Sequence, residues 1–190
     1  MKETLRAFIA VPIPNAMADF LQQVQVRLTA RRINIRWVAA GNIHLTLKFL
    51  GDIGPRQVAE VASRMDAAGA SATSFALRAS GVGVFPNRRR ARVLWVGLDG
   101  DLERLRVLQQ DLESRLAAAG FDRSARAYRA HLTIGRARRP VPAKILAELL
   151  EPVQHVASDP FRVDRLVLFR SLLKPTGARY VRLHTAHLTQ

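Results

Sequence analysis

The chain has 190 residues, of which 48% are apolar and 24% are charged, ordinary values for one globular domain or two small lobes that share a core. No run of 18 apolar residues is present, which excludes a membrane-spanning helix, and the lack of cysteine excludes disulfides and thiol nucleophiles. The net charge of +15 indicates a polyanionic partner, although this arginine-rich composition can also follow from GC-rich coding. We expect a cytoplasmic protein without a membrane partner, since the absence of cysteine fits a reducing compartment.

The first half of the chain alternates expected strands and helices. The N-terminus, residues 1–11, is too short and too early charged for a signal peptide, and its part from 5 to 11 is typical of a buried strand. A helix follows over 15–31, with apolar residues at helical spacing. Further along, the expected elements are strands at 35–38 and about 43–50, a helix from Pro55 to near Gly69, and strands at 74–79 and 81–85.

The second half continues with a loop at 86–90 and a strand at 92–98. The remaining predicted elements are a helix at 101–119 that stops at Gly120, a strand at 131–136, a helix at 142–150, and strands at about 161–170 and 179–186 around a turn at 174–177. This order predicts an α+β fold with helices outside antiparallel sheets.

One short pattern occurs in both halves. His44-Leu45-Thr46-Leu47 and His131-Leu132-Thr133-Ile134 each read as histidine, apolar, threonine, apolar. Because alternate side chains of a strand share a face, each histidine points with its threonine and the apolar residues point to the core. A third copy, His187-Leu188-Thr189, lacks the fourth apolar residue and is interpreted as a decoy.

Two histidines and two threonines around one cleft suit a phosphodiester. A neutral imidazole can take a proton from the attacking oxygen while a protonated one gives a proton to the leaving oxygen. Threonine hydroxyls can hold the non-bridging oxygens, where charge accumulates. No acidic residue lies within three residues of either histidine, so we expect no metal and no cofactor. The structural alternative is that both histidines are half-buried strand residues bonded to the backbone.

With these motifs the chain resembles the 2H phosphoesterases, specifically the RNA 2′,3′-cyclic phosphodiesterases, also called 2′-5′ RNA ligases. The segments that carry the resemblance span nearly the whole chain: 6–12, 37–38 with 42–51, 83–87 with 92–97, 131–136, and 170–171 with 177–180. The chain departs from the family pattern at Ala130, where proline is common, and at Gly135, where alanine or leucine is usual.

The resemblance implies a bilobal α+β fold, with two antiparallel sheets related by a pseudo-twofold axis, helices outside and a central cleft, so we expect residues 1–190 to form a single domain of two interleaved lobes. It implies metal-independent hydrolysis of RNA or nucleoside 2′,3′-cyclic phosphates to 2′-phosphates, and the reverse 2′-5′ joining. His44 would be the proton donor and His131 the proton acceptor, while Thr46, Thr133 and Arg136 would bind the phosphate. The expected partners are RNA or nucleotides with 2′,3′-cyclic phosphate ends, and the expected state is a monomer.

Several neighbouring residues are assigned from strand alternation. Lys48 shares the parity of His44 and is either at the cleft rim or solvated, and Arg136 reaches the cleft only if its strand bends or ends. Phe49 and Trp95 are predicted to be core residues, whereas Phe85 and Tyr128 are better candidates for stacking on a base. The remaining basic and histidine residues are expected at the surface or in structural roles: Arg88, Arg89, Arg90, His155 and His184.

Two other functions remain open at this point. A 2H enzyme could act on 2′-5′ oligonucleotides or on an ADP-ribose cyclic phosphate instead. A non-catalytic RNA-binding module would use the net charge alone and would show salt-sensitive binding that survives loss of both histidines.

Overall fold

The computed structural model describes residues 4–29, 34–174 and 177–190. The strands are β1 (Leu5–Pro12), β2 (Ile35–Trp37), β3 (His44–Ile53), β4 (Phe75–Phe85), β5 (Val93–Gly100), β6 (Leu132–Ala137), β7 (Phe161–Val163), β8 (Arg165–Lys174) and β9 (Gly177–His187). The helices are α1 (Asn15–Thr29), α2 (Pro55–Ala70), α3 (Leu102–Ala118) and α4 (Ala143–Leu150), with short 3-10 turns at Ala40–Asn42 and Glu151–Val153. The predicted end of the first helix and the tip of the predicted turn at 174–177 fall on residues 30–31 and 175–176, which lie outside the described residues.

The α+β fold is confirmed, but the expectation of two separate sheets is wrong. In the described part of the chain nine strands form one antiparallel sheet, in the order β7-β4-β5-β6-β3-β1-β8-β9, with β2 paired to β6. The two central strands, β3 and β6, are joined at the single pair Leu45–Leu132. The sheet is therefore continuous at this point, and the two motif strands diverge on either side of it.

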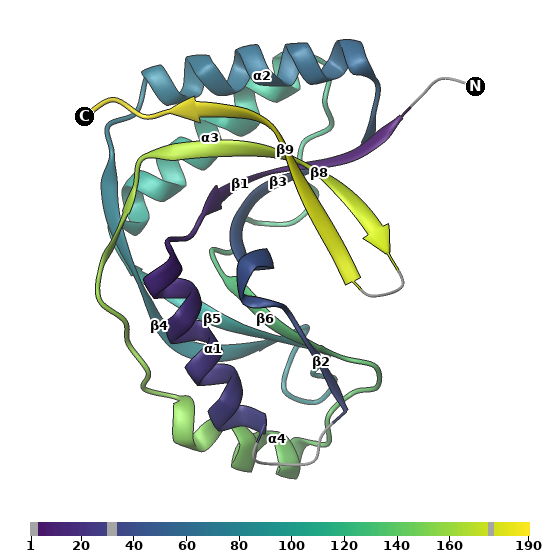
Figure 1. Ribbon diagram of the computed structural model, residues 1–190, viewed down its shortest axis with the longest axis vertical. Coiled ribbons are helices and arrows are strands. Elements are labelled where there is room, and N and C mark those ends of the chain that lie inside the picture. Colours follow the sequence, from purple (N-terminus) through teal and green to yellow (C-terminus); the bar gives the residue numbers. More distant parts are fainter. Residues whose placement is uncertain (1–3, 30–33, 175–176) are drawn as a thin grey trace.

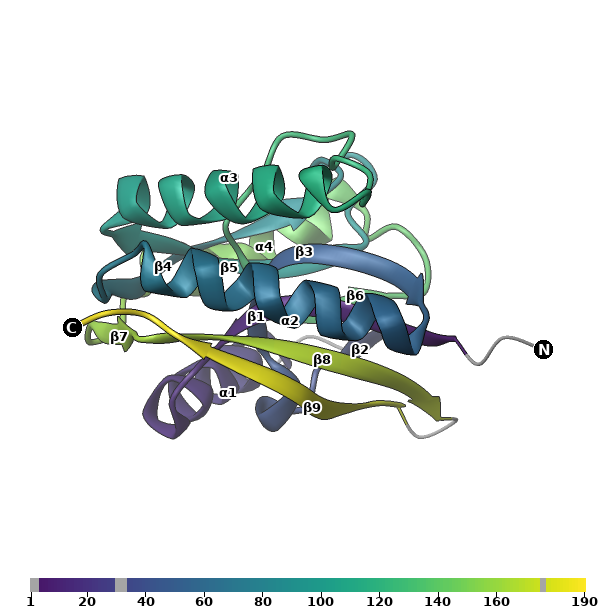
Figure 2. The same ribbon diagram turned by 90° about the horizontal axis from the view of Figure 1, so that it is seen from above.

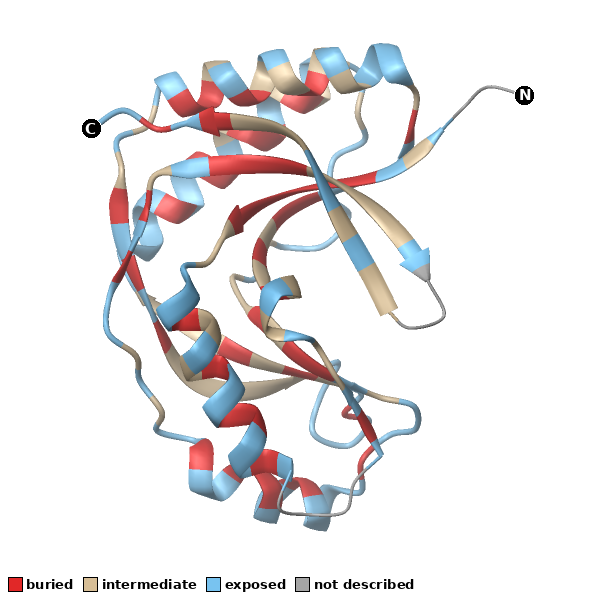
Figure 3. Cartoon of the chain, viewed as in Figure 1, coloured by how far each residue is buried: buried red, intermediate tan, exposed pale blue. Residues whose placement is uncertain are grey.

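The helices bury their apolar faces against this curved sheet. In Figure 1, α2 and α3 lie at the top of the molecule and α4 lies at the bottom, and Figure 2 shows α2 and α3 side by side. Each helix turns its apolar residues inward, as the helical spacing predicts, and the buried positions in Figure 3 follow the same faces. Gly120, with φ +85°, ends α3 as predicted: its N–H bonds the Ala117 carbonyl, and the Phe121 N–H bonds the Leu116 carbonyl.

The strands predicted at 74–79 and 81–85 are one strand, β4, with a bulge at Gly81. The register against β5 shifts between Ser80 and Val82, and Gly81 adopts a φ of +65°, which a residue with a side chain rarely adopts. The Gly81 N–H donates to the Val156 carbonyl at 2.9 Å, so the segment after α4 covers this edge of the strand.

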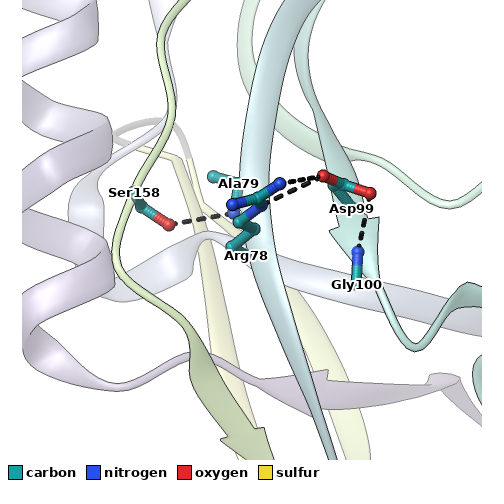
Figure 4. A network of polar contacts seen from close by, with 5 residues as sticks. All are labelled: Arg78, Ala79, Asp99, Gly100 and Ser158. Carbon is teal, nitrogen blue, oxygen red and sulfur yellow. Dashed lines mark hydrogen bonds and ion pairs between the residues drawn. The ribbon is translucent and has the colours of Figure 1, made fainter.

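Side chains complete the cover of this edge. The Ser158 hydroxyl accepts from the Ala79 N–H at 2.9 Å, and on the same strand Arg78 pairs with Asp99 of β5 (Figure 4). The predicted strand at 161–170 also divides at Asp164: β7 pairs with β4, whereas β8 pairs with β1 and β9. These contacts hold β4 in place, and the far end of that strand supports the site described next.

Candidate active site

The two histidine motifs meet at the centre of the sheet. Leu45 of β3 pairs with Leu132 of β6, and both side chains are fully buried. In an antiparallel pair with this register, His44 lies beside Thr133 and Thr46 lies beside His131, on the face opposite the buried leucines. The structure thus brings all four predicted side chains to one cleft, which has a volume of about 950 Å³.

Both imidazole rings are held in the same way. The Nδ1 atom of His44 lies 2.8 Å from the Asn42 carbonyl, and Nδ1 of His131 lies 2.7 Å from the Arg129 carbonyl. Because a carbonyl oxygen can only accept, each Nδ1 carries a hydrogen and each Nε2 remains for chemistry. The same bond to the residue two positions earlier fixes the same tautomer in both rings.

Aromatic side chains support each ring. Phe8 stacks on His44 at 4.7 Å between centroids, and Tyr180 approaches the same ring edge-on at 5.2 Å. Phe85, at the end of β4, approaches His131 edge-on at 4.9 Å. These contacts limit the rotation of both imidazoles and exclude water from one side of each ring.

Burial lowers the pKa of both histidines below the ordinary value of 6.5. The bonds to Asn42 and Arg129 oppose this effect, and the charge of Arg136 lowers the pKa of both imidazoles further. The charge of His131 also lowers the pKa of His44, as expected for two imidazoles that share one site. Each ring is therefore mostly neutral at neutral pH in the free protein, and an anion in the cleft would favour its protonated form.

A bulge follows the threonine in each motif strand. Against β1, Thr46 pairs with Ala10 and Lys48 with Ile9, so Leu47 is an extra residue. Against β5, Thr133 pairs with Trp95 and Gly135 with Leu94, so Ile134 is an extra residue. Leu47 and Ile134 occupy the same place in the two motifs, and each bulge reverses which side chains beyond it face the cleft.

The bulge in β3 makes two of the predictions wrong. Lys48, expected at the cleft rim or in solvent, is 4% exposed and bonds Glu113 of α3 at 2.8 Å. Phe49, expected in the core, is 68% exposed and lines the cleft. Strand alternation fails here because the bulge interrupts it.

The bulge in β6 turns Arg136 toward the cleft, where the resemblance places it. The amide of Gln25, on α1, stabilises this bulge by donating to the carbonyls of Ile134 and Val38, both at 2.8 Å. Next to the bulge, Gly135 packs under β2, where an added Cβ would lie 2.8 Å from the Ile35 side chain. The departure from the family pattern at this position thus lets β2 approach β6.

The cleft is strongly basic. Among the described residues that line it, five are arginines and none is acidic: Arg6, Arg36, Arg136, Arg138 and Arg179. This concentration of charge attracts a polyanion to the face that carries both histidines. These five arginines, which are part of the net charge of +15, therefore lie at the cleft that holds both histidines.

Several other predicted residues lie elsewhere. Phe85 supports His131 but does not line the cleft, and Tyr128 is half-buried, with a hydroxyl that has no partner among the described residues. Neither side chain lines the cleft, and stacking of either ring on a base stays a prediction. The third copy of the motif also lies outside the cleft, and the backbone N–H and the hydroxyl of Thr189 both donate to the Ala72 carbonyl.

The sequence patterns did not indicate Asn42 as a site residue. Its backbone carbonyl holds His44, and its side-chain amide donates to the Ala178 carbonyl of β9 at 2.8 Å. The segment before the first histidine is thereby tied to the β8–β9 hairpin, which borders the cleft. An asparagine two residues before the His-x-Thr motif was the available signal.

Two kinds of feature are absent from the described residues. No three histidine, cysteine or acidic side chains gather in a way that could hold a metal ion. No helix in this part of the chain has the length and hydropathy that a membrane crossing requires.

Comparison with known proteins places these features in context. A family model of LigT-like phosphoesterases matches twice, over residues 11–95 and 96–180. The RNA 2′,3′-cyclic phosphodiesterases of Methanothermobacter thermautotrophicus and Thermotoga maritima are 33% and 29% identical, over 97% and 93% of this chain and 99% and 91% of their own lengths. The crystal structure of E. coli LigT with 3′-AMP superposes with a TM-score of 0.74 at 25% identity, covering 99% of this chain and 100% of that one.

Proposed function

The chain belongs to the LigT-like phosphoesterase family, and we propose that it acts as an RNA 2′,3′-cyclic phosphodiesterase. The observation that carries the proposal is the pairing of Leu45 with Leu132, which sets two histidines and two threonines alternately around one point of the cleft. The relatives named above act on RNA 2′,3′-cyclic phosphates, and E. coli LigT binds 3′-AMP. RNA or nucleotides that end in a 2′,3′-cyclic phosphate are therefore the proposed substrates.

In this mechanism His131 is the base and His44 is the acid. Neutral His131 takes a proton from water through Nε2, and the water oxygen attacks phosphorus in line with the 3′ oxygen. Protonated His44 gives its Nε2 proton to that oxygen as the bond to phosphorus breaks. The product is a 2′-phosphomonoester with a free 3′ hydroxyl.

Three other side chains act on the phosphate. The hydroxyls of Thr46 and Thr133, one from each strand, donate to the non-bridging oxygens, which gain charge in the transition state. The Arg136 guanidinium neutralises the same oxygens and suits their geometry better than a lysine would. The bulge at Ile134 supports this role because it brings Arg136 to the face of Thr133.

The proposal is tested by incubating the purified protein with adenosine 2′,3′-cyclic phosphate in excess chelator and identifying the product regioisomer. We expect adenosine 2′-phosphate, with turnover unaffected by the chelator. His44→Ala and His131→Ala should each lower kcat by about 10²- to 10⁴-fold, the usual contribution of a general acid or base. His155→Ala is the matched control, because His155 is exposed and lies outside the cleft.

Each component of the proposal can fail separately. Near-normal turnover in both cleft variants would refute the assignment of the two histidines. Loss of turnover in chelator would refute the metal-independent mechanism, and an adenosine 3′-phosphate product would reverse the assignment of the leaving oxygen.

A further inference from the structure

The arginines outside the cleft fall into two groups. Five of them each form an ion pair with an acidic side chain: Arg64, Arg78, Arg106, Arg115 and Arg165. Another group is exposed and has no ion-pair partner in the part of the chain that the structure describes. This group, here called the arginine surface, consists of Arg88, Arg89, Arg90, Arg92, Arg138 and Arg139. Unpaired like charges repel one another, so such a group is stabilised by a bound anion.

Two segments that are distant in the sequence form the arginine surface, namely the loop between β4 and β5 and the chain that follows β6. Backbone bonds hold them together. The Ala137 N–H donates to the Arg92 carbonyl at 2.8 Å, and the Val141 N–H donates to the Ala91 carbonyl at 3.0 Å. Both segments lie at the end of the sheet where β5, β6 and β2 meet (Figure 1). The six arginines therefore share one end of the molecule.

The loop between β4 and β5 has a defined shape. The side-chain oxygen of Asn87 accepts from the N–H groups of Arg89 and Arg90 at 3.0 and 3.1 Å. At the base of the loop, the Arg92 N–H donates to the Phe85 carbonyl at 2.8 Å. These bonds use the backbone of the arginines and not their side chains. The guanidinium groups thus remain available to a ligand, and the loop keeps its bonds when they are replaced.

The arginine surface continues into the cleft on the side of His131. Arg138 belongs to this surface and also lines the cleft, together with Arg136. Arg129 flanks the same histidine from the other direction. Its guanidinium carbon lies 5.7 Å from the centroid of the Phe85 ring, and its charge lowers the pKa of His131. A continuous set of cations therefore leads out of the cleft.

The sequence around these arginines contains no opposite charge. Residues 81–98 and 123–142 contain ten arginines and no acidic residue. The arginine surface also offers no large apolar side chain that would enter a lipid bilayer, whereas it adjoins a cleft that is proposed to hold the end of an RNA strand. A single nucleotide fills only the cleft, but each further nucleotide of a strand adds one phosphate. Among polyanions, these features favour RNA over a membrane.

From these observations we infer that the arginine surface binds the phosphate backbone of the RNA strand whose cyclic phosphate occupies the cleft. The inference rests on the proposed function, which places the end of the strand beside His131. Contacts to phosphates position a strand without reading its sequence. The arginine surface therefore favours long substrates over mononucleotides, whatever their bases.

The experiment compares two substrates that differ in length: adenosine 2′,3′-cyclic phosphate and a single-stranded RNA of about ten nucleotides with the same cyclic end. In the triple variant Arg88→Gln, Arg89→Gln, Arg90→Gln, kcat/KM on the RNA should fall about 10- to 50-fold at about 0.15 M salt, through KM. Each lost phosphate contact releases about 0.7 fewer counterions, so the slope of log kcat/KM against log salt concentration should become less steep by about 2. Activity on the mononucleotide should be unchanged, which also shows that the variant is folded.

The matched control is the triple variant Arg78→Gln, Arg106→Gln, Arg165→Gln, which removes three exposed charges that lie outside the cleft. It changes the net charge equally and should alter turnover of the RNA by about twofold or less, because salt screens charges that do not contact the strand.

Three outcomes would overturn the inference while turnover of the mononucleotide upholds the proposed function. They are an equal loss in both triple variants, an equal loss on both substrates, and no loss in the loop variant. In the last case, binding to phosphatidylserine vesicles that only the loop variant lacks would assign the arginine surface to a lipid instead. If the unaltered protein hydrolyses neither substrate, the proposed function fails, and the inference fails with it.

Discussion

Replacing Lys48 by methionine should destabilise the fold far more than loss of a surface lysine. Lys48 is 4% exposed and Glu113 is 8% exposed, and Nζ lies 2.8 Å from Oε1. The ammonium also donates to the Asp122 carbonyl at 2.7 Å, while the Ser124 N–H donates to the same carboxylate oxygen at 2.6 Å. The pair therefore joins β3, α3 and the segment that leads to the second histidine.

The size of the loss follows from this geometry. At an effective dielectric constant of about 20, two unit charges 2.8 Å apart attract by roughly 6 kcal/mol, a gross value that desolvation reduces. Removing one partner leaves the other charge buried, which typically costs about 3–5 kcal/mol. The second carboxylate oxygen of Glu113, Oε2, is buried and has no hydrogen-bond partner among the described residues. We expect Lys48→Met to lose about 3–5 kcal/mol, a large part of the roughly 5–15 kcal/mol of a typical domain.

The effect should depend on pH with a definite sign. Burial raises the pKa of Glu113, but the bonds from Lys48 and Ser124 outweigh it, so the pKa lies below the ordinary 4.5. A carboxylate with a lowered folded-state pKa stabilises the protein above its unfolded pKa and loses that contribution as pH falls through the folded value. The difference between the original protein and Lys48→Met should thus be largest at neutral pH and shrink as the pH falls toward and through 4.5.

The measurement is urea unfolding followed by tryptophan fluorescence at neutral and acidic pH. The double variant Lys48→Met, Glu113→Leu should recover much of the loss, because it removes both buried charges. Glu60→Gln is the control: its exposed pair with Arg64 should contribute about 0.5 kcal/mol or less. A loss below about 1 kcal/mol in Lys48→Met would refute the reasoning, since it would mean that the buried carboxylate needs no cation.

Three further predictions concern the site. Because burial lowers the pKa of His44 and His131, the bell-shaped pH profile of kcat/KM should be centred below pH 6.5. The alkaline limb of the kcat profile should lie at higher pH, because bound phosphate favours protonated His44. A kcat/KM profile centred above about pH 7.5 would contradict this prediction. Asn42→Ala keeps the backbone carbonyl that holds His44 but removes the side-chain bond to the Ala178 carbonyl of β9, so KM should rise without a change in the pH profile. An unchanged KM would exclude a role for this bond in substrate binding. Gln25→Leu leaves the Ile134 bulge without its donor and should cost about 1–3 kcal/mol in urea unfolding, together with a raised KM; a loss of stability alone would separate the bulge from phosphate binding.

The sequence predicts most of the elements and the four side chains of the site because both follow short periodic rules. Helical spacing gives the faces of α1, α2 and α3, and strand alternation directs His44 with Thr46 and His131 with Thr133. Each rule needs only neighbouring residues. The pairing of the two motifs, Leu45 with Leu132, is a tertiary fact, and here the resemblance to a known family supplied what spacing could not.

The errors arise where one strand depends on another. The bulges at Leu47 and Ile134 exist only relative to β1 and β5, so no pattern within either motif reveals them. The bulge at Leu47 accounts for the misplacement of Lys48 and Phe49. The division of the predicted strand at Asp164 has the same origin, because its two parts pair with different strands of the sheet.

The bulge after the threonine is repeated in the two motifs, but the side chains that it exposes differ. A phosphate offers equivalent oxygens to both sides, and the matched threonines and the matched Nδ1 bonds of the histidines suit that equivalence. A nucleotide is not symmetric beyond the phosphate, so identical side chains at the next cleft position would serve one of its two ends poorly. Both bulges expose the third residue after threonine, where one motif carries Arg136 and the other Phe49. The two motifs therefore share one backbone bulge but present different side chains to the cleft at this position.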